Sequence, residues 1–123
     1  MQINLYSGSV ERPMPTPLVD VSALVLSTAN PHNRPDLRAL DGRDGRVQAY
    51  CESSKNWGVR RELLLHRIKM AVKNSKATEL NVAIYCKKGR HRSVAMVETL
   101  ARQLKKEHVV VVTHRELGGV THG

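Results

Sequence analysis

The sequence predicts an α/β fold built on a mostly parallel sheet. The patterns that support this prediction lie in the C-terminal half of the chain. Residues 80–86 form a continuous apolar run, which is typical of a strand covered on both faces, as in parallel sheets. An amphipathic helical pattern follows, and residues 108–117 supply another buried strand, so this half predicts a βαβ unit. With 123 residues the chain is near the commonest domain size. We expect a single domain over residues 1–123, ordered from about residue 3 to residue 117, with a frayed tail at 118–123.

The N-terminal half predicts two strands and a long loop. Residues 2–8 predict a short strand, and the connector after it cannot be helical because it contains Pro13, Pro15 and Pro17. Residues 18–26 are rich in β-branched and aliphatic side chains and predict a second strand. Pro31, Pro35, Gly42 and Gly45 then predict an irregular loop over residues 27–45. Long loops of this kind in compact domains are often functional.

Three helices are expected. Residues 46–54 predict a short helix, and residues 56–74 predict a longer one with apolar side chains at helical spacing, namely Trp57, Leu64, Ile68 and Ala71. The other face of the longer helix is basic, which is either an ordinary solvated face or a nucleic-acid footprint. The third helix lies between the predicted strands at 80–86 and 108–117 and carries one apolar stripe, formed by Val97, Leu100, Ala101 and Leu104.

Charge and composition restrict the class of partner. Twenty Lys and Arg residues against eleven Asp and Glu give a formal net charge of +9. A small domain this basic usually binds nucleic acid, a phosphorylated metabolite or a membrane surface. The alternative is that the charge only keeps the protein soluble and indicates no anionic partner. No apolar run approaches the roughly 20 residues of a membrane span, and the N-terminus lacks the layout of a signal peptide. With only Cys51 and Cys86 present, a reducing cytoplasm is the expected compartment.

Residues 86–93 join a predicted strand to a predicted helix, and their composition predicts an anion-binding loop. Such a turn lies at the carboxyl edge of the sheet, where the first helical turn offers free N–H groups and a positive dipole end. Gly89 lets the backbone curve around an anion, Arg92 can grip two oxygens, and Ser93 can cap the helix or donate to a phosphate oxygen. Five basic side chains around this glycine would repel one another without an anion: Lys87, Lys88, Arg90, His91 and Arg92.

The same loop fits a second chemistry. Cys86 and Arg92 form the Cys-x5-Arg pattern, followed by Ser93, of Cys-dependent phosphatases, in which a thiolate attacks a phosphate ester. Two features oppose it: Tyr85 stands where those enzymes most often have His, and a mobile acid must be assumed at Asp41 or Asp44. A structural, strand-ending Cys86 is the preferred interpretation. No Walker motif and no closely spaced metal-ligand set occurs, so neither a metal nor a cofactor is expected.

Four ordered motifs resemble the C-terminal domain family of the RNase adapter protein RapZ, also described as the YvcJ-type nucleotide-binding family. "CKKGRHRS" is similar to that family's C-x-G-G-[KR]-H-R-S loop, and "DVSALVLSTANPH" followed by "LRALDGRDGRV" resembles its upstream segments. "THREL" resembles its closing H-R-x-L, and "YSG" before the prolines and "LVDV" resembles its opening. The resemblance covers about residues 3–117.

The resemblance implies a sugar-phosphate pocket, with glucosamine-6-phosphate as the family's ligand, and a part in binding a small regulatory RNA. It assigns the phosphate to Gly89, His91, Arg92 and Ser93, and the sugar to Asp20 and His32. Further residues match motif positions without a firm role: Arg38, Asp44, His114 and Arg115. The family's quaternary habit also implies self-association into a homo-oligomer.

This chain departs from the family pattern inside the pocket. Lys87 and Lys88 replace a small residue and a glycine, Ser22 replaces an arginine, and about four extra residues separate Asp20 from Asn30. We therefore expect a non-catalytic module that binds a phosphorylated small molecule, or a phosphate or sulfate anion, with RNA as a second candidate partner. Few aromatic side chains are available for base stacking, so RNA contact would be dominated by the phosphate backbone.

Overall fold

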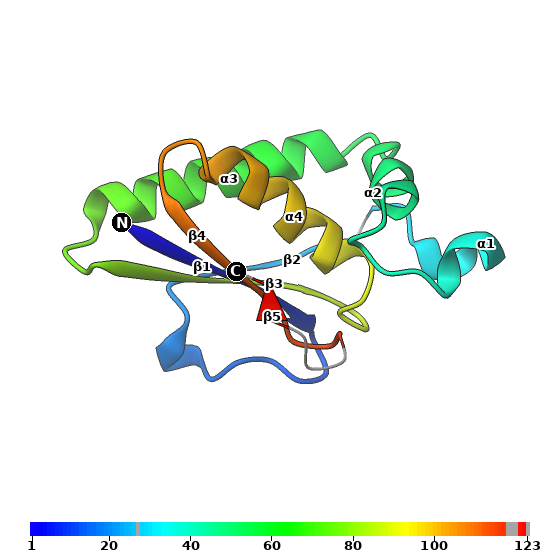
Figure 1. Ribbon diagram of the computed structural model, residues 1–123, viewed down its shortest axis with the longest axis horizontal. Coiled ribbons are helices and arrows are strands. Elements are labelled where there is room, and N and C mark those ends of the chain that lie inside the picture. The colour runs from blue at the N-terminus through cyan, green and yellow to red at the C-terminus, as the bar shows by residue number, and fades with distance from the viewer. Residues whose placement is uncertain (27, 118–120, 123) are drawn as a thin grey trace.

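The computed structural model describes residues 1–26, 28–117 and 121–122, and its centre is one five-stranded sheet. The strands lie in the order β2-β3-β1-β4-β5 (Figure 1). Their bounds are Gln2–Ser9 for β1, Val21–Leu24 for β2, Glu79–Cys86 for β3, Val109–His114 for β4 and Thr121–His122 for β5. The β1–β3, β1–β4 and β2–β3 pairs are parallel, and β5 is antiparallel to β4. The predicted α/β class with a mostly parallel sheet is confirmed.

The helices cover one face of this sheet. In Figure 1, α3 (Trp57–Asn74) and α4 (Arg92–Leu104) lie over the same face, and α1 (Pro35–Arg38) and α2 (Gly45–Glu52) lie beyond the end where β3 finishes. The connector after β1 crosses the opposite face and contains the 3₁₀ turn η1 (Thr16–Leu18). Within the described part of the chain, no helix combines the length and apolar character needed to cross a membrane.

Alternating strand residues form the core against α3 and α4. Ile3, Leu5, Val82 and Ile84 are fully buried, because successive strand side chains point to opposite faces and these residues meet the helices. The amphipathic stripe of α4 is buried as predicted. Of the apolar residues predicted for α3, Trp57, Leu64 and Ile68 are buried, and Ala71 is half-buried. The side chains of α3 and α4 in this core are Trp57, Leu64, Leu65, Ile68, Ala95, Met96, Val97, Leu100, Ala101 and Leu104, and α1 and α2 add Leu37, Val47 and Cys51. On the other face, the Tyr85 hydroxyl accepts a hydrogen bond of 2.9 Å from the Met14 amide, which fastens the connector.

The structure corrects three details of the element prediction. The expected strand at 18–26 is shortened to β2, because η1 begins at Thr16 and continues to Leu18. The expected irregular loop at 27–45 contains η2 (Pro31–Asn33) and α1, each beginning at a proline whose fixed φ suits the first helical position. The tail was expected to be frayed, but residues 121–122 pair with β4 as β5, while residues 118–120 and 123 lie outside the described residues.

The order of connections places a crevice at the carboxyl ends of the strands. The chain leaves β1 across one face toward β2, and it leaves β3 through α4 on the other face toward β4. Because β1 and β3 are neighbours, these two connections leave adjacent strands and run over opposite faces of the sheet. Ligands of open α/β sheets bind at such a point of divergence.

Candidate functional site

A cleft with a volume of about 540 Å³ lies at this edge of the sheet. Every segment that leaves the carboxyl end of β1, β2, β3 or β4 contributes to it. Its lining residues are Arg12, Asn30, His32, Asn33, Arg38, Cys86, Lys87, Lys88, Arg90, His91, Arg92 and Glu116. Six of these are Lys or Arg and one is an acid, so the cleft is strongly cationic.

Gly89 fixes the shape of the loop between β3 and α4. Its φ is +75°, the left-handed region that favours glycine. A side chain there would lie 2.7 Å from the carbonyl carbon of Gly8 and 2.8 Å from the amide of Ser9, so the loop packs directly on the end of β1. The Ser9 hydroxyl also donates a hydrogen bond of 2.6 Å to the Lys87 carbonyl. The loop is therefore held in one conformation by the neighbouring strand.

Backbone amides of the loop are available to an anion. The first N–H groups of α4, from Arg92 onward, have no partner within the helix. In the described chain, the amides of residues 87–91 also have no hydrogen-bond acceptor. Consecutive free N–H groups at a helix start attract anions, because their dipoles and that of the helix point the same way.

Arg92 places a positive charge at the inner wall of the cleft. Its side chain is only 6% exposed, and one guanidinium nitrogen donates a hydrogen bond of 2.6 Å to the Leu26 carbonyl. No carboxylate lies within ion-pair distance of it among the described residues. A buried arginine without a carboxylate partner is costly in an apolar interior, whereas an anion bound in the cleft would compensate its charge.

His91 fixes the loop to the segment before α2. Its Nε2 donates hydrogen bonds to the carbonyls of Leu40 and Arg38, at 2.7 and 3.2 Å, which assigns the ring hydrogen to that nitrogen. Burial lowers the pKa of His91, so the ring is neutral at pH 7. The imidazole lies at the cleft wall, but its Nε2 is already used by these two carbonyls.

The remaining cations surround the mouth of the cleft. Lys88 is 3.3 Å from Glu11, and Arg12 is 2.9 Å from Glu116, so two weak bridges connect the loop, the end of β1 and the end of β4. Arg38 donates a hydrogen bond of 2.8 Å to the His32 carbonyl. Lys87 and Arg90 are exposed at the same mouth.

Cys86 lies at the base of the cleft and contacts Ser93. The two side chains are buried, and the Cys86 thiol donates a hydrogen bond of 3.2 Å to the Ser93 hydroxyl. Cys51 is not a comparable nucleophile, because burial raises its pKa to about 12. The sequence pattern of Cys86, Arg92 and Ser93 therefore corresponds to a real cluster.

The two carboxylates considered as acids for a phosphatase are committed elsewhere. Asp41 is bound to Arg43 by a bidentate contact, and although burial opposes ionisation, these hydrogen bonds lower the pKa of Asp41. Asp44 caps α2 by accepting the Arg46 amide, and its hydrogen bond with the Arg46 side chain lowers its pKa. Both groups are ionised at pH 7 and neither lines the cleft.

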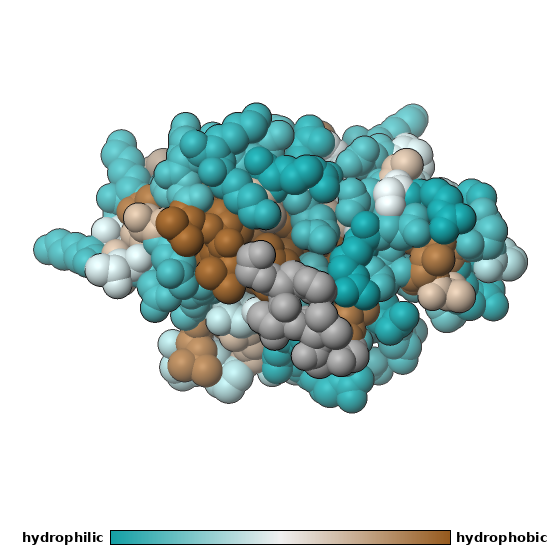
Figure 2. Space-filling model, in the orientation of Figure 1, coloured by the Kyte–Doolittle hydropathy of each residue, from teal (hydrophilic) through white to brown (hydrophobic). Residues whose placement is uncertain are grey.

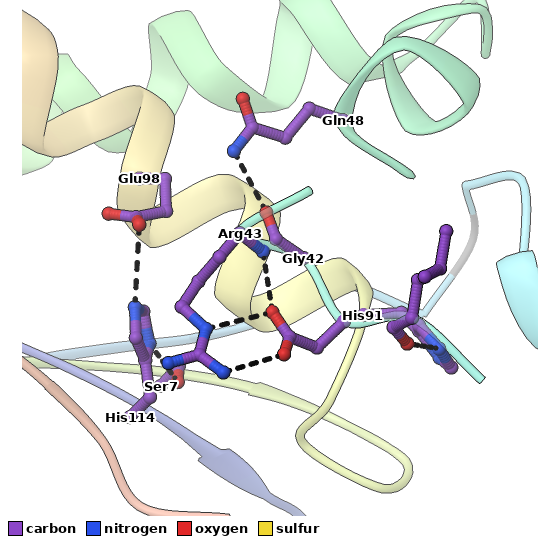
Figure 3. Close-up of polar contacts among 9 residues, drawn as sticks. Ser7, Gly42, Arg43, Gln48, His91, Glu98 and His114 are labelled. Carbon is purple, nitrogen blue, oxygen red and sulfur yellow. Dashed lines mark hydrogen bonds and ion pairs between the residues drawn. The ribbon is translucent and has the colours of Figure 1, made fainter. Parts of the chain in front are cut away.

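Five of the predicted ligand residues are outside the cleft lining: Gly89 and Ser93, which belong to the loop and the first turn of α4, and Asp20, His114 and Arg115. Asp20 stands at the start of β2, at the opposite edge of the sheet, where its carboxylate accepts the Asn81 amide at 2.7 Å. His114 is 2% exposed and hydrogen bonded to the Ser7 hydroxyl at 2.7 Å, with Glu98 beyond it (Figure 3). Arg115 donates to the Arg12 carbonyl at 2.9 Å, outside the lining.

Four lining residues were not among the predicted site residues: Arg12, Asn30, Asn33 and Glu116. Each follows β1, β2 or β4, and position after a parallel strand was the signal that could have found them. Across the ranges that the structure describes, no three His, Cys, Asp or Glu side chains are grouped so that they could share a metal ion.

The fold and the cleft define a class of protein: an α/β domain with a glycine-containing, basic strand-to-helix loop at the carboxyl edge of a parallel sheet. Comparison with protein families makes this specific. The family model of the RapZ C-terminal domain matches residues 1–118, and the chain belongs to that family.

Curated relatives agree with this assignment. A nucleotide-binding protein of Ruegeria pomeroyi is 36% identical over 121 residues, which is 95% of this chain and 42% of the relative. Nucleotide-binding proteins of Lactobacillus helveticus and Methylibium petroleiphilum are 39% and 40% identical over 92 and 91 residues, 72% of this chain in each case and 31% and 30% of those proteins. The chain thus spans less than half the length of these relatives.

Proposed function

We propose that the cleft binds a phosphorylated small molecule, with its phosphoryl group against residues 87–93. The observation that carries this proposal is the buried Arg92 guanidinium, which has no carboxylate partner in the described chain and lies beside the free amides of the loop. The relatives are named nucleotide-binding proteins, which supports a phosphorylated class of ligand. The role is that of a regulatory binding module rather than an enzyme, since Asp41 and Asp44 are ionised and outside the cleft.

Thermal unfolding in the presence of ligand tests this proposal. We expect inorganic phosphate and hexose phosphates to raise the melting temperature of the wild-type protein, because a ligand that binds only the folded state stabilises it. Arg92→Ala is expected to abolish the rise, and Arg90→Ala, at an exposed position, to weaken it without a risk to folding. Arg67→Ala removes an exposed arginine of α3 outside the cleft and is the matched control. A wild-type protein that phosphorylated sugars never stabilise would refute the proposal.

A Cys-dependent phosphatase is the second candidate function, favoured by the contact of 3.2 Å between Cys86 and Ser93. In that reaction the Cys86 thiolate would attack phosphorus, forming a P–S bond as the ester P–O bond breaks and the leaving oxygen gains a proton. Turnover of an aryl phosphate by the wild-type protein, lost in Cys86→Ser, would establish it. We expect no turnover in either protein, because neither carboxylate considered as the acid, Asp41 or Asp44, lines the cleft, and Glu116, which does, is bound to Arg12 at 2.9 Å.

A further inference from the structure

The cleft carries more positive charge than one phosphoryl group neutralises. Of its six Lys and Arg residues, Arg12 is paired with Glu116, and Lys88 is paired with Glu11. In the described ranges the other four have no carboxylate within ion-pair distance: Arg38, Lys87, Arg90 and Arg92. A phosphate monoester carries about 1.5 to 2 negative charges at pH 7, so at least two cations of the cleft would remain uncompensated.

These cations lie at two depths. Arg92 is buried beside the amides at the start of α4, whereas Lys87, Lys88 and Arg90 are exposed at the mouth. The Lys88–Glu11 pair has side chains that are 61% and 51% exposed, so it is a weak contact that an anion can replace. The outer lysines are flexible point charges, which suit a second phosphate that need not be held in one fixed orientation.

We propose, building on the proposed function, that the cleft selects ligands with two linked phosphoryl groups, the diphosphate class, over monophosphates. The inner phosphoryl group binds Arg92 and the loop amides, and the outer one binds Lys87 and Lys88. The cleft volume of about 540 Å³ is within the range of small-molecule sites and leaves room for both groups.

Calorimetric titration of the full chain with inorganic phosphate and with pyrophosphate, at one pH and ionic strength, tests the selection. We expect pyrophosphate to bind about tenfold more tightly than phosphate to the wild-type protein. In the double variant Lys87→Ala with Lys88→Ala, this ratio falls to about threefold or less, because pyrophosphate loses more affinity than phosphate does. Lys105→Ala with Lys106→Ala is the matched control, because it removes two adjacent lysines at the other end of α4 and should leave the ratio unchanged.

The outcomes separate this inference from the proposed function. If phosphate binds and pyrophosphate binds no more tightly, or if the ratio survives loss of Lys87 and Lys88, the diphosphate selection is overturned and the phosphate site stands. If neither anion binds, both proposals fail. Citrate, which has similar charge but no phosphoryl group, measures the general attraction of a basic surface, and a citrate affinity equal to that of pyrophosphate would also overturn the selection.

Discussion

Gly42 shows how closely the long loop packs on the start of α4. Its amide donates a hydrogen bond of 2.8 Å to the Arg90 carbonyl, and a methyl group on its Cα would collide with the His91 carbonyl oxygen and the Ala95 amide. We predict that Gly42→Ala destabilises the protein by about 2 kcal/mol, in the range for overpacked sites, because backbone atoms must move to admit the side chain. Denaturant-induced unfolding of the variant measures this change.

Gly45→Ala is the matched control for that prediction. A methyl group at Gly45 meets no atom within 4 Å, and the residue begins α2, where alanine is the better helix former. We expect this variant to be neutral or stabilised by up to about 1 kcal/mol. Equal stability of the two variants would show that the close contact between Gly42 and the first turn of α4 does not persist in solution.

At the scale of single residues, the sequence predicted the loop but not what each of its side chains contacts. Gly89 has a positive φ and Arg92 lines the cleft. The loop could be predicted because glycine content and position after a strand are local properties. His91 contacts the carbonyls of Leu40 and Arg38, and Asp20 binds the Asn81 amide at the other edge of the sheet. Those contacts depend on how distant segments pack, which motif spacing does not encode.

At the scale of elements, one buried histidine connects three of them. His114 on β4 is hydrogen bonded to Ser7 on β1 at 2.7 Å, and its Nε2 is 3.8 Å from a Glu98 carboxylate oxygen on α4 (Figure 3). The contact with the imidazole lowers the pKa of Glu98. We predict that Ser7→Ala lowers the free energy of unfolding by about 1–3 kcal/mol, because it leaves a buried ring nitrogen without a partner.

Ser22→Ala is the control for this prediction, since Ser22 is exposed on the edge strand β2. Its free energy of unfolding should stay within about 0.5 kcal/mol of wild type by the same denaturation measurement. A Ser7→Ala protein as stable as the Ser22→Ala protein would mean that water replaces the lost hydroxyl and that the link between β1 and β4 adds little.

Clear patterns of apolar residues in the sequence predicted the long strands and helices well. They did not predict the single-turn helices or the short strand that pairs with a distant segment. The apolar run at 80–86 corresponds to β3 to within one residue, and the predicted apolar stripe lies within α4. Burial on both faces and helical spacing leave clear local signals. η2 and α1 were missed, since each is a single turn begun by a proline that equally predicts a loop. β5 was missed because two residues that pair with a distant strand have no local pattern.

At the scale of the whole molecule, charge is the dominant surface property. Hydrophilic residues cover most of the face shown in Figure 2, including the upper edge over α3 and α4. The exposed side of α3 carries Arg67, Lys69 and Lys73, and the cleft adds its own cations. Trp57 and Tyr85 are buried, so these two aromatic rings are unavailable for stacking on bases. A polyanion would therefore be held through its phosphates rather than read by sequence.

The last prediction concerns RNA, which the family resemblance and the formal charge of +9 both suggest as a partner. We predict that single-stranded RNA binds at low ionic strength. In a plot of the logarithm of the affinity against the logarithm of the salt concentration, we expect a slope of about −0.7 for each neutralised phosphate. The double variant Arg67→Glu with Lys69→Glu should reduce the magnitude of that slope more than the control variant Lys105→Glu with Lys106→Glu does. The control changes the net charge by the same amount, at a place away from the exposed face of α3. Equal losses would mean that net charge alone drives binding, and no binding at low salt would exclude RNA as a partner. Fluorescence anisotropy across a salt series gives both the affinity and the slope.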